Sequence, residues 1–279
     1  MKKVGFIDYY LDEWHANNYP EFLKNRSNGE YQVCFAYGQI DSPIGGMTNK
    51  EWSEKYGILL CDTAEEVIEK SDVLIVLSPD NPEMHEELCE LPLESGKLVY
   101  IDKTFAPDRA TAVRIFDYAD KHNTKCYSSS ALGFSSELDE IDITDIDTIF
   151  SEGPGPFKIY VIHQLEMIVR LMNCRATKVM YTGNEAHPAL VIEFEDGRLC
   201  HLIHREDDAH SFQLTIADKN NDARKITIES DYFGLFIDAL IKFFDCGVVP
   251  VEHKRTIEVI GIREVAMKAM NTPFSWIEI

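Results

Sequence analysis

The sequence predicts a two-domain α/β protein, with a doubly wound parallel sheet in residues 1–125 and an α+β domain with a mainly antiparallel sheet in residues 126–279. In the first part, apolar runs typical of buried strands alternate with amphipathic helical segments. In the second part, alternating apolar and polar runs are joined by short turn sequences, which favours hairpins. A length of 279 residues is enough for two domains of ordinary size.

Four apolar runs predict the strands of the first domain. Helix signals separate these runs: Thr48 and Thr63 each precede a glutamate by three residues, the spacing of a capping box, and Asn81 precedes a proline. Parallel strands joined by helices form right-handed crossovers, so helices are expected on both faces, as in Rossmann-type dinucleotide-binding domains. The four runs cover residues 3–7, 31–37, 73–77 and 98–101.

The second domain is expected to begin with a helix at residues 163–172 and to end with helices at 231–244 and 254–270. Such a sheet with helices on one side leaves an apolar face that must be covered. We therefore expect a homodimer or larger homo-oligomer that pairs second-domain sheets. The strands are expected at residues 178–181, 190–194, 199–204, 212–217 and 225–228, with a short final strand within 274–279.

The composition excludes several classes of partner. A formal net charge of −21 argues against nucleic acid and anionic membranes, because both need a basic surface. No apolar run is long enough to cross a bilayer, and the first residues lack the apolar core of a signal peptide. The seven cysteines are scattered without a C-x-x-C pair, which predicts reduced thiols and a cytoplasmic protein.

The turn after the first strand departs from the dinucleotide-binding fingerprint. That fingerprint places glycines where the backbone approaches a pyrophosphate, but residues 7–13 here read Ile-Asp-Tyr-Tyr-Leu-Asp-Glu. A carboxylate at Asp8 that lay ~4 Å from a phosphate charge would cost about 4 kcal/mol at an effective dielectric of ~20. The turn therefore predicts weak or unusual dinucleotide binding.

Residues 78–85 and 94–104 together resemble the glucose–fructose oxidoreductase/inositol dehydrogenase (Gfo/Idh/MocA) family. That family has a strand ending in Thr-Pro, then an Asn and a helical His, then a Gly-Lys-x-Val strand ending in Glu-Lys-Pro. Here the corresponding sequences are Ser-Pro with Asn81 and His85, and Gly-Lys-Leu-Val with a final Asp102-Lys103-Thr104. His15, residues 162–166 and residues 259–276 are similar to further parts of the family pattern.

The resemblance implies an NAD- or NADP-dependent oxidoreductase acting on a sugar, polyol or related hydroxy compound. Lys103 would orient a substrate hydroxyl, and His163 would accept its proton. The family's aspartate four residues before that histidine is Ile159 here. His204 and Arg205 would face the substrate, and Lys103 and His163 would face one another across the interdomain cleft. The expected cofactor-lining residues are Asp8, Tyr9, Tyr10, Ser78, Pro79, Asn81, His85 and Asp102.

Two alternatives remain open from the sequence. The missing glycines, Asp8 and Ile159 favour a catalytically inactive relative that serves as a ligand-binding or regulatory module. Tyr9 and Tyr10 could instead accommodate a different cofactor or a tightly bound product. A metal site is not expected, because His201 and His204 lie three apart on a predicted strand and face opposite sides. Further candidate ligands in the neighbouring sequence are Asp207, Asp208 and His210.

Overall fold

The computed structural model describes residues 1–206, 210–220 and 222–279, so Asp207 and Asp208 lie outside the described residues. These residues form two compact units. The first contains Met1–Ser129 and Phe236–His253, and the second contains Ser130–Leu235 and Lys254–Ile279. The second domain was expected to cover residues 126–279 without interruption. In the structure, Phe236–His253 belong to the first unit.

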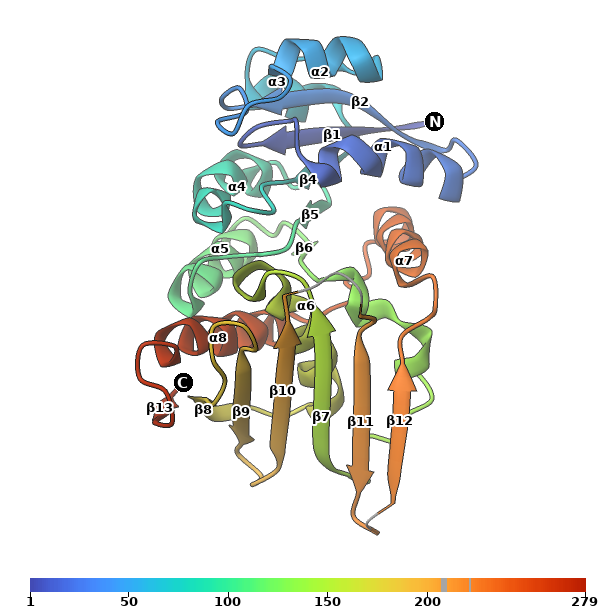
Figure 1. Cartoon of the computed structure of the whole chain (residues 1–279). Helices are drawn as coiled ribbons and strands as arrows, with labels where there is room; N and C mark the ends of the chain where they lie inside the picture. Colours follow the sequence, from blue (N-terminus) through green and yellow to red (C-terminus); the bar gives the residue numbers. More distant parts are fainter. Residues whose placement is uncertain (207–209, 221) are drawn as a thin grey trace. The chain divides into compact units, whose positions relative to one another are not determined.

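The first unit contains a six-stranded parallel sheet in the order β3-β2-β1-β4-β5-β6 (Figure 1). The order reverses between β1 and β4, as in a doubly wound sheet. Every residue of β4 is buried, which explains its continuous apolar sequence. The strands are β1 (Lys2–Asp8), β2 (Tyr31–Gly38), β3 (Leu59–Leu60), β4 (Val73–Val76), β5 (Val99–Ile101) and β6 (Cys126–Tyr127).

The predicted helix starts are largely confirmed. Thr48 and Glu51 form the complete capping box of α2, and the Thr63 hydroxyl accepts the Glu66 N–H at the start of α3. The Asn81 side chain caps nothing, because a short 3₁₀ turn at Pro82–Met84 precedes α4. The helices are α1 (Trp14–Arg26), α2 (Asn49–Tyr56), α3 (Ala64–Lys70), α4 (His85–Glu94) and α5 (Arg109–Lys121).

Part of helix α7 (Tyr232–Cys246) completes the aromatic core of the first unit. The Phe236 ring lies 6.1 Å from the Tyr19 ring and 5.3 Å from the Tyr100 ring, measured between centroids. Phe243 contacts Tyr127 edge-on at 5.0 Å. This helix therefore contributes to the sheet's packing although it lies more than a hundred residues beyond β6 in sequence.

The second unit contains a seven-stranded mixed sheet in the order β12-β11-β7-β10-β9-β8-β13. Only β7 and β10 pair in parallel among the strand pairs of the described residues; the others are antiparallel, as predicted. Strand β7, which lies between β11 and β10 inside the sheet, was not predicted from the sequence. The strands are β7 (Ile146–Pro154), β8 (Ala176–Tyr181), β9 (Ala189–Phe194), β10 (Leu199–Arg205), β11 (Gln213–Asp218), β12 (Ala223–Thr227) and β13 (Trp276–Glu278).

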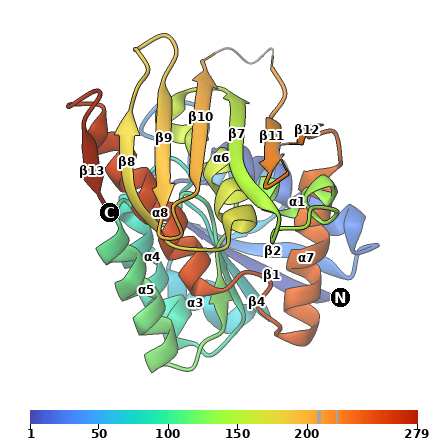
Figure 2. The same cartoon turned by 90° about the horizontal axis from the view of Figure 1, so that it is seen from below.

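Helix α6 (Phe157–Met172) packs against β7 and β10 and covers one face of this sheet (Figure 2). Helix α8 (His253–Ala269) is tied to the unit by Glu258, which accepts the Ala176 N–H of β8. The opposite face carries Phe150, which is 47% exposed, and Ile203, which is 51% exposed. Among the described residues, no helix is long and apolar enough to span a membrane.

Replacement of Phe236 by alanine tests the contribution of α7 to the first unit. Phe236 is 1% exposed, so its loss should lower the free energy of unfolding by about 3–5 kcal/mol. Phe274→Ala is the matched control, because Phe274 is 72% exposed and little burial is lost there. Denaturant titration measures both. Equal destabilisation by the two changes would contradict the packing described for α7.

Candidate functional site

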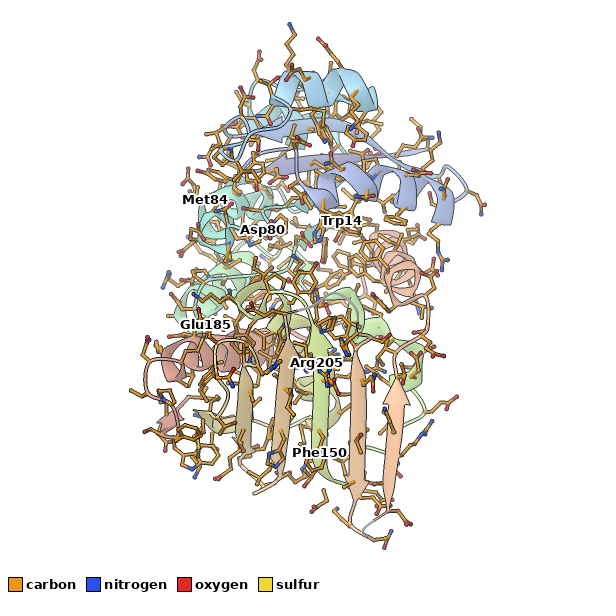
Figure 3. The ribbon with its side chains drawn as sticks, viewed as in Figure 1. Trp14, Asp80, Met84, Phe150, Glu185 and Arg205 are labelled. Atoms are coloured by element: carbon orange, nitrogen blue, oxygen red, sulfur yellow. The ribbon has the colours of Figure 1, made fainter. Side chains whose placement is uncertain are left out.

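The carboxyl ends of the parallel strands bring together the predicted site residues of the first unit. Ile7 pairs with Val76, and Val76 pairs with Ile101, so the segments that follow these three strands lie side by side. Open α/β sheets bind ligands at this edge. Trp14, which begins α1, and Asp80, which follows β4, are labelled here in Figure 3.

Asp102 follows β5 and is fully buried. Its Oδ2 contacts His15 Nδ1, and its Oδ1 accepts hydrogen bonds from the hydroxyls of Tyr19 and Tyr100, each at 3.2 Å. Burial alone would raise the pKa of this carboxyl, but the attraction and hydrogen bond of His15 outweigh burial and lower it. The shortened acid of the Asp102-Lys103 sequence thus anchors His15 and helix α1.

Asp8 ends β1 and is also fully buried, but neither of its carboxyl oxygens forms a hydrogen bond with the described residues. The backbone N–H groups of Tyr9 and Tyr10 are close enough to favour the charged form without making a well-formed bond. Burial, followed by the nearby charges of Asp102 and Asp80, raises the pKa of Asp8 well above its usual value. The uncharged form of Asp8 is therefore favoured.

Glu13 caps the N-terminus of α1 with its own side chain. Its carboxyl accepts the N–H groups of His15, at 2.6 Å, and of Ala16. Burial, followed by the charges of Asp8 and Asp102, raises the pKa of Glu13 well above its usual value. A dinucleotide pyrophosphate usually binds the N–H groups at this position. As the residues stand, the β1–α1 turn does not fit a pyrophosphate in its usual place.

The segment after β4 is held by its own hydrogen bonds. The Ser78 hydroxyl donates to the Asn81 carbonyl at 3.0 Å, and Pro79 lies between these residues. His85 is fully buried, and its Nδ1 lies 3.0 Å from the Thr104 carbonyl and 3.1 Å from the Phe105 carbonyl. Burial lowers the pKa of His85, so the neutral ring donates from Nδ1 and ties α4 to the segment after Lys103. This contact is structural, and the expected place of His85 beside a cofactor remains a prediction.

Lys103 is the second residue after β5 and is half-buried, and its charge contributes to the lowered pKa of Asp102. It belongs to the first unit, whereas His163 belongs to the second. The predicted approach of these two side chains therefore remains a prediction. Each residue can be described only within its own unit.

In the second unit, His163 of α6 is oriented by a serine that the sequence analysis did not identify. His163 Nδ1 lies 2.6 Å from the hydroxyl oxygen of Ser130. The Ser130 N–H donates to Glu166 at 3.1 Å, and the Ser130 hydroxyl accepts the Leu132 N–H at 3.3 Å. Ile159, at the position of the family's aspartate, offers no polar group. The only local signal for Ser130 was the run of three serines at 128–130, all of which are buried.

The expectation that His204 faces a substrate needs correction. Cys200, Leu202 and His204 alternate onto the helix-covered face of β10, and His204 is fully buried. Its Nδ1 lies 2.7 Å from Gln164 Oε1, and its Nε2 lies 2.6 Å from the Gly155 carbonyl oxygen. Burial lowers the pKa of His204. Both ring nitrogens face carbonyl oxygens within the unit, so the neutral ring donates a hydrogen bond to only one of them and braces α6 against the sheet.

Arg205 points to the other side of β10. Its Nε lies 2.8 Å from Glu152 Oε1, and its Nη1 lies 2.9 Å from His210 Nε2. Figure 3 labels it at the end of the strand. His201 stacks on Phe150 at 5.1 Å on this same face, so His201 and His204 do point to opposite sides of the strand. No metal-binding group of three ligands occurs among the described residues.

A groove of about 670 Å³ lies on the first unit between α4 and α5. Its rim is mostly acidic, and Arg114 within it is paired with Glu86 at 2.6 Å. None of the predicted site residues lines this groove, so we assign it no part in the site. Its lining residues include Glu83, Glu87, Cys89, Glu90, Leu93 and Tyr118.

The pH dependence of stability tests the state of Asp8. Its pKa is higher in the folded protein than in the unfolded chain, so folding takes up a proton and stability falls as pH rises above the usual aspartate range. Asp8→Asn cannot ionise. We expect this variant to melt at a higher temperature than the unaltered protein at neutral pH, and the difference to shrink as pH is lowered.

Asp245→Asn provides the control with the opposite sign. Hydrogen bonds from Lys2 and Tyr31 lower the pKa of Asp245, so its contribution is present at neutral pH and is lost as pH falls through the folded-state pKa. This variant should be slightly less stable at neutral pH and should match the unaltered protein in acid. If Asp8→Asn were the destabilised variant at neutral pH, Asp8 would be a charged, stabilising group.

The chain is similar over its whole length to solved structures of two-domain dehydrogenases. GenD2 from gentamicin A biosynthesis, solved in complex with NAD, has a TM-score of 0.79 at 10% identity, with 100% of this chain and 97% of that chain covered. The myo-inositol 2-dehydrogenase of Lactobacillus plantarum has a TM-score of 0.77 at 14% identity, with 100% of this chain and 99% of that chain covered.

A third structure, the UDP-N-acetylglucosamine 3-dehydrogenase GnnA of Acidithiobacillus ferrooxidans, has a TM-score of 0.75 at 12% identity, with 98% of this chain and 97% of that chain covered. No protein-family model matches the sequence, and no curated protein matches it. At these identities the likeness establishes the fold. The chain therefore has the two-domain fold of these sugar and inositol dehydrogenases, which confirms the fold class predicted from the sequence.

Proposed function

We propose that the protein is an oxidoreductase that uses a nicotinamide cofactor, NAD or NADP, on a sugar, a polyol or a related hydroxy compound. The observation that carries the proposal is the held imidazole of His163, whose Nδ1 lies 2.6 Å from the Ser130 hydroxyl. Its other ring nitrogen is the atom we assign to accept a proton. Lys103, at the ligand-binding edge of the parallel sheet, is the second polar group.

The similar structures support the same class of reaction, because the three named above are a NAD complex, an inositol dehydrogenase and a sugar-nucleotide dehydrogenase. In this proposal Lys103 orients the substrate hydroxyl and His163 takes its proton. For Nε2 to accept a proton, Nδ1 must already carry one, so the Ser130 hydroxyl oxygen accepts the Nδ1–H both before and after the transfer. It can therefore remain bonded to His163 in both protonation states.

Turnover by the unaltered protein, with NAD and NADP and a panel of sugars and polyols, tests this proposal. His163→Ala should lower kcat on the order of a hundredfold or more, because it removes the proton acceptor. Lys103→Met should have a comparable effect. Both variants should melt near the temperature of the unaltered protein, because neither side chain is fully buried.

Ser130→Ala provides a graded comparison, since it leaves the imidazole in place but removes its hydroxyl partner. Its kcat should fall less than that of His163→Ala. Full activity in His163→Ala or Lys103→Met would contradict the role proposed for that residue. The absence of turnover with every substrate and both cofactors would favour the ligand-binding or regulatory alternative.

We also propose that two copies associate through the open face of the second-unit sheet. Phe150 on β7, Ile203 on β10 and Trp276 on β13 are all exposed, although large apolar side chains are normally buried. Figure 3 labels Phe150 on this face. A two-fold axis would place the same patch on both partners, as in most homodimers.

All seven cysteines are free thiols, which supports the predicted location in the reducing cytoplasm.

The assembly proposal is tested by light scattering of the purified protein at micromolar concentration. The unaltered protein should give the mass of a dimer or a larger oligomer, and Phe150→Glu should shift it toward the monomer, because association would bury an unpaired charge. Ile44→Glu is the control, since Ile44 is 81% exposed and belongs to the first unit. A monomeric mass for the unaltered protein would contradict association through this face.

A further inference from the structure

We infer that the Glu13 carboxyl group occupies the anion-binding position at the N-terminus of α1, so that a dinucleotide pyrophosphate can bind there only by displacing it. Glu13 then determines how tightly the first unit holds a dinucleotide. The inference rests on the proposed function, because that function brings a dinucleotide to this edge of the sheet.

The hydrogen bonds of the first turn of α1 carry the inference. The first N–H groups of a helix have no partner within the helix, and in dinucleotide-binding domains a pyrophosphate accepts hydrogen bonds from such groups. Here the His15 and Ala16 N–H groups donate to the Glu13 side chain, and the Asn17 N–H donates to the Glu13 carbonyl at 3.0 Å. The groups that would hold a phosphate already have an internal acceptor.

Glu13 is an unusual cap, because helix N-caps are normally the shorter Ser, Thr, Asp or Asn. Its longer side chain folds back over the helix end and is only 7% exposed as a residue. The preceding turn is filled in the same manner, since Tyr10 and Leu11 are buried where a fingerprint would have side-chain-free glycines. The anion-binding position is therefore occupied by the chain itself.

The charges around Glu13 explain why it can be displaced. Asp8 from the end of β1 and Asp102 from the end of β5 face it, and both raise its pKa after burial has done so. His15 of α1 is paired with Asp102, so it does little to offset the negative charge around Glu13. A carboxyl group in such surroundings gains stability by becoming neutral or by moving into water. Glu13 is thus held at this position by two hydrogen bonds against an unfavourable electrostatic environment.

Isothermal titration calorimetry on the full chain tests the inference, with inorganic pyrophosphate, NADH and NADPH as separate probes. Glu13→Ser keeps a good N-cap but removes the long acidic side chain. We expect its affinity for pyrophosphate and for at least one dinucleotide to rise tenfold or more over the unaltered protein. Asp245→Asn is the charge control, since it removes one carboxylate near Lys2 at the start of β1, and its affinities should not change.

Glu13→Asn serves as a second variant if Glu13→Ser melts too low to titrate, because asparagine is also a favoured N-cap and its side chain is shorter and uncharged. Its affinities should also rise. The inference is overturned if the variants bind every probe with the same affinity as the unaltered protein. This holds also if the unaltered protein already binds NADH in the low micromolar range. A gain for pyrophosphate without binding of either dinucleotide supports the inference on Glu13 and contradicts the proposed function.

Discussion

The buried negative charge of Asp102 is the constraint on which the first unit's ligand-binding edge depends. A carboxylate that is fully buried must be paired and hydrogen-bonded, and Asp102 satisfies this with His15, Tyr19 and Tyr100. Removal of one partner from such a pair typically costs about 3–5 kcal/mol, because the remaining charge is left uncompensated. The pairing fixes α1 against β5 and therefore fixes the conformation of the β1–α1 turn.

The same charge determines the state of its acidic neighbours. His15 is paired with Asp102, and the carboxyls of Asp8 and Glu13, which lie near that charge, both have raised pKa values. The edge thus holds three buried carboxyl groups, of which Asp102 has a lowered pKa and Asp8 and Glu13 have raised ones. A dinucleotide-binding fold normally keeps this region free of side chains, so the chain retains the architecture but has changed the chemistry at its most characteristic turn.

In the second unit, His163 and His204 are held by neutral groups. Ser130 partners His163, and Gln164 joins His204 to Ser151, with donor–acceptor distances of 2.6, 2.7 and 3.0 Å along these contacts. Buried networks of this kind are stable only when every member has a partner. Ile159 has no polar side-chain group, and the Ser130 hydroxyl holds His163 Nδ1 without adding charge to an already acidic protein.

The sequence by itself determined the parallel sheet, most of the second sheet and the absence of glycines after β1, because local periodicity and turn chemistry report on neighbouring residues. It established that His201 and His204 face opposite sides, but not which side α6 covers. It missed β7, whose inward positions include Ser151 and Gly153 and so lack an apolar alternation. The pairs Ser130–His163 and His15–Asp102 join residues 33 and 87 positions apart, and only tertiary packing could bring them into contact.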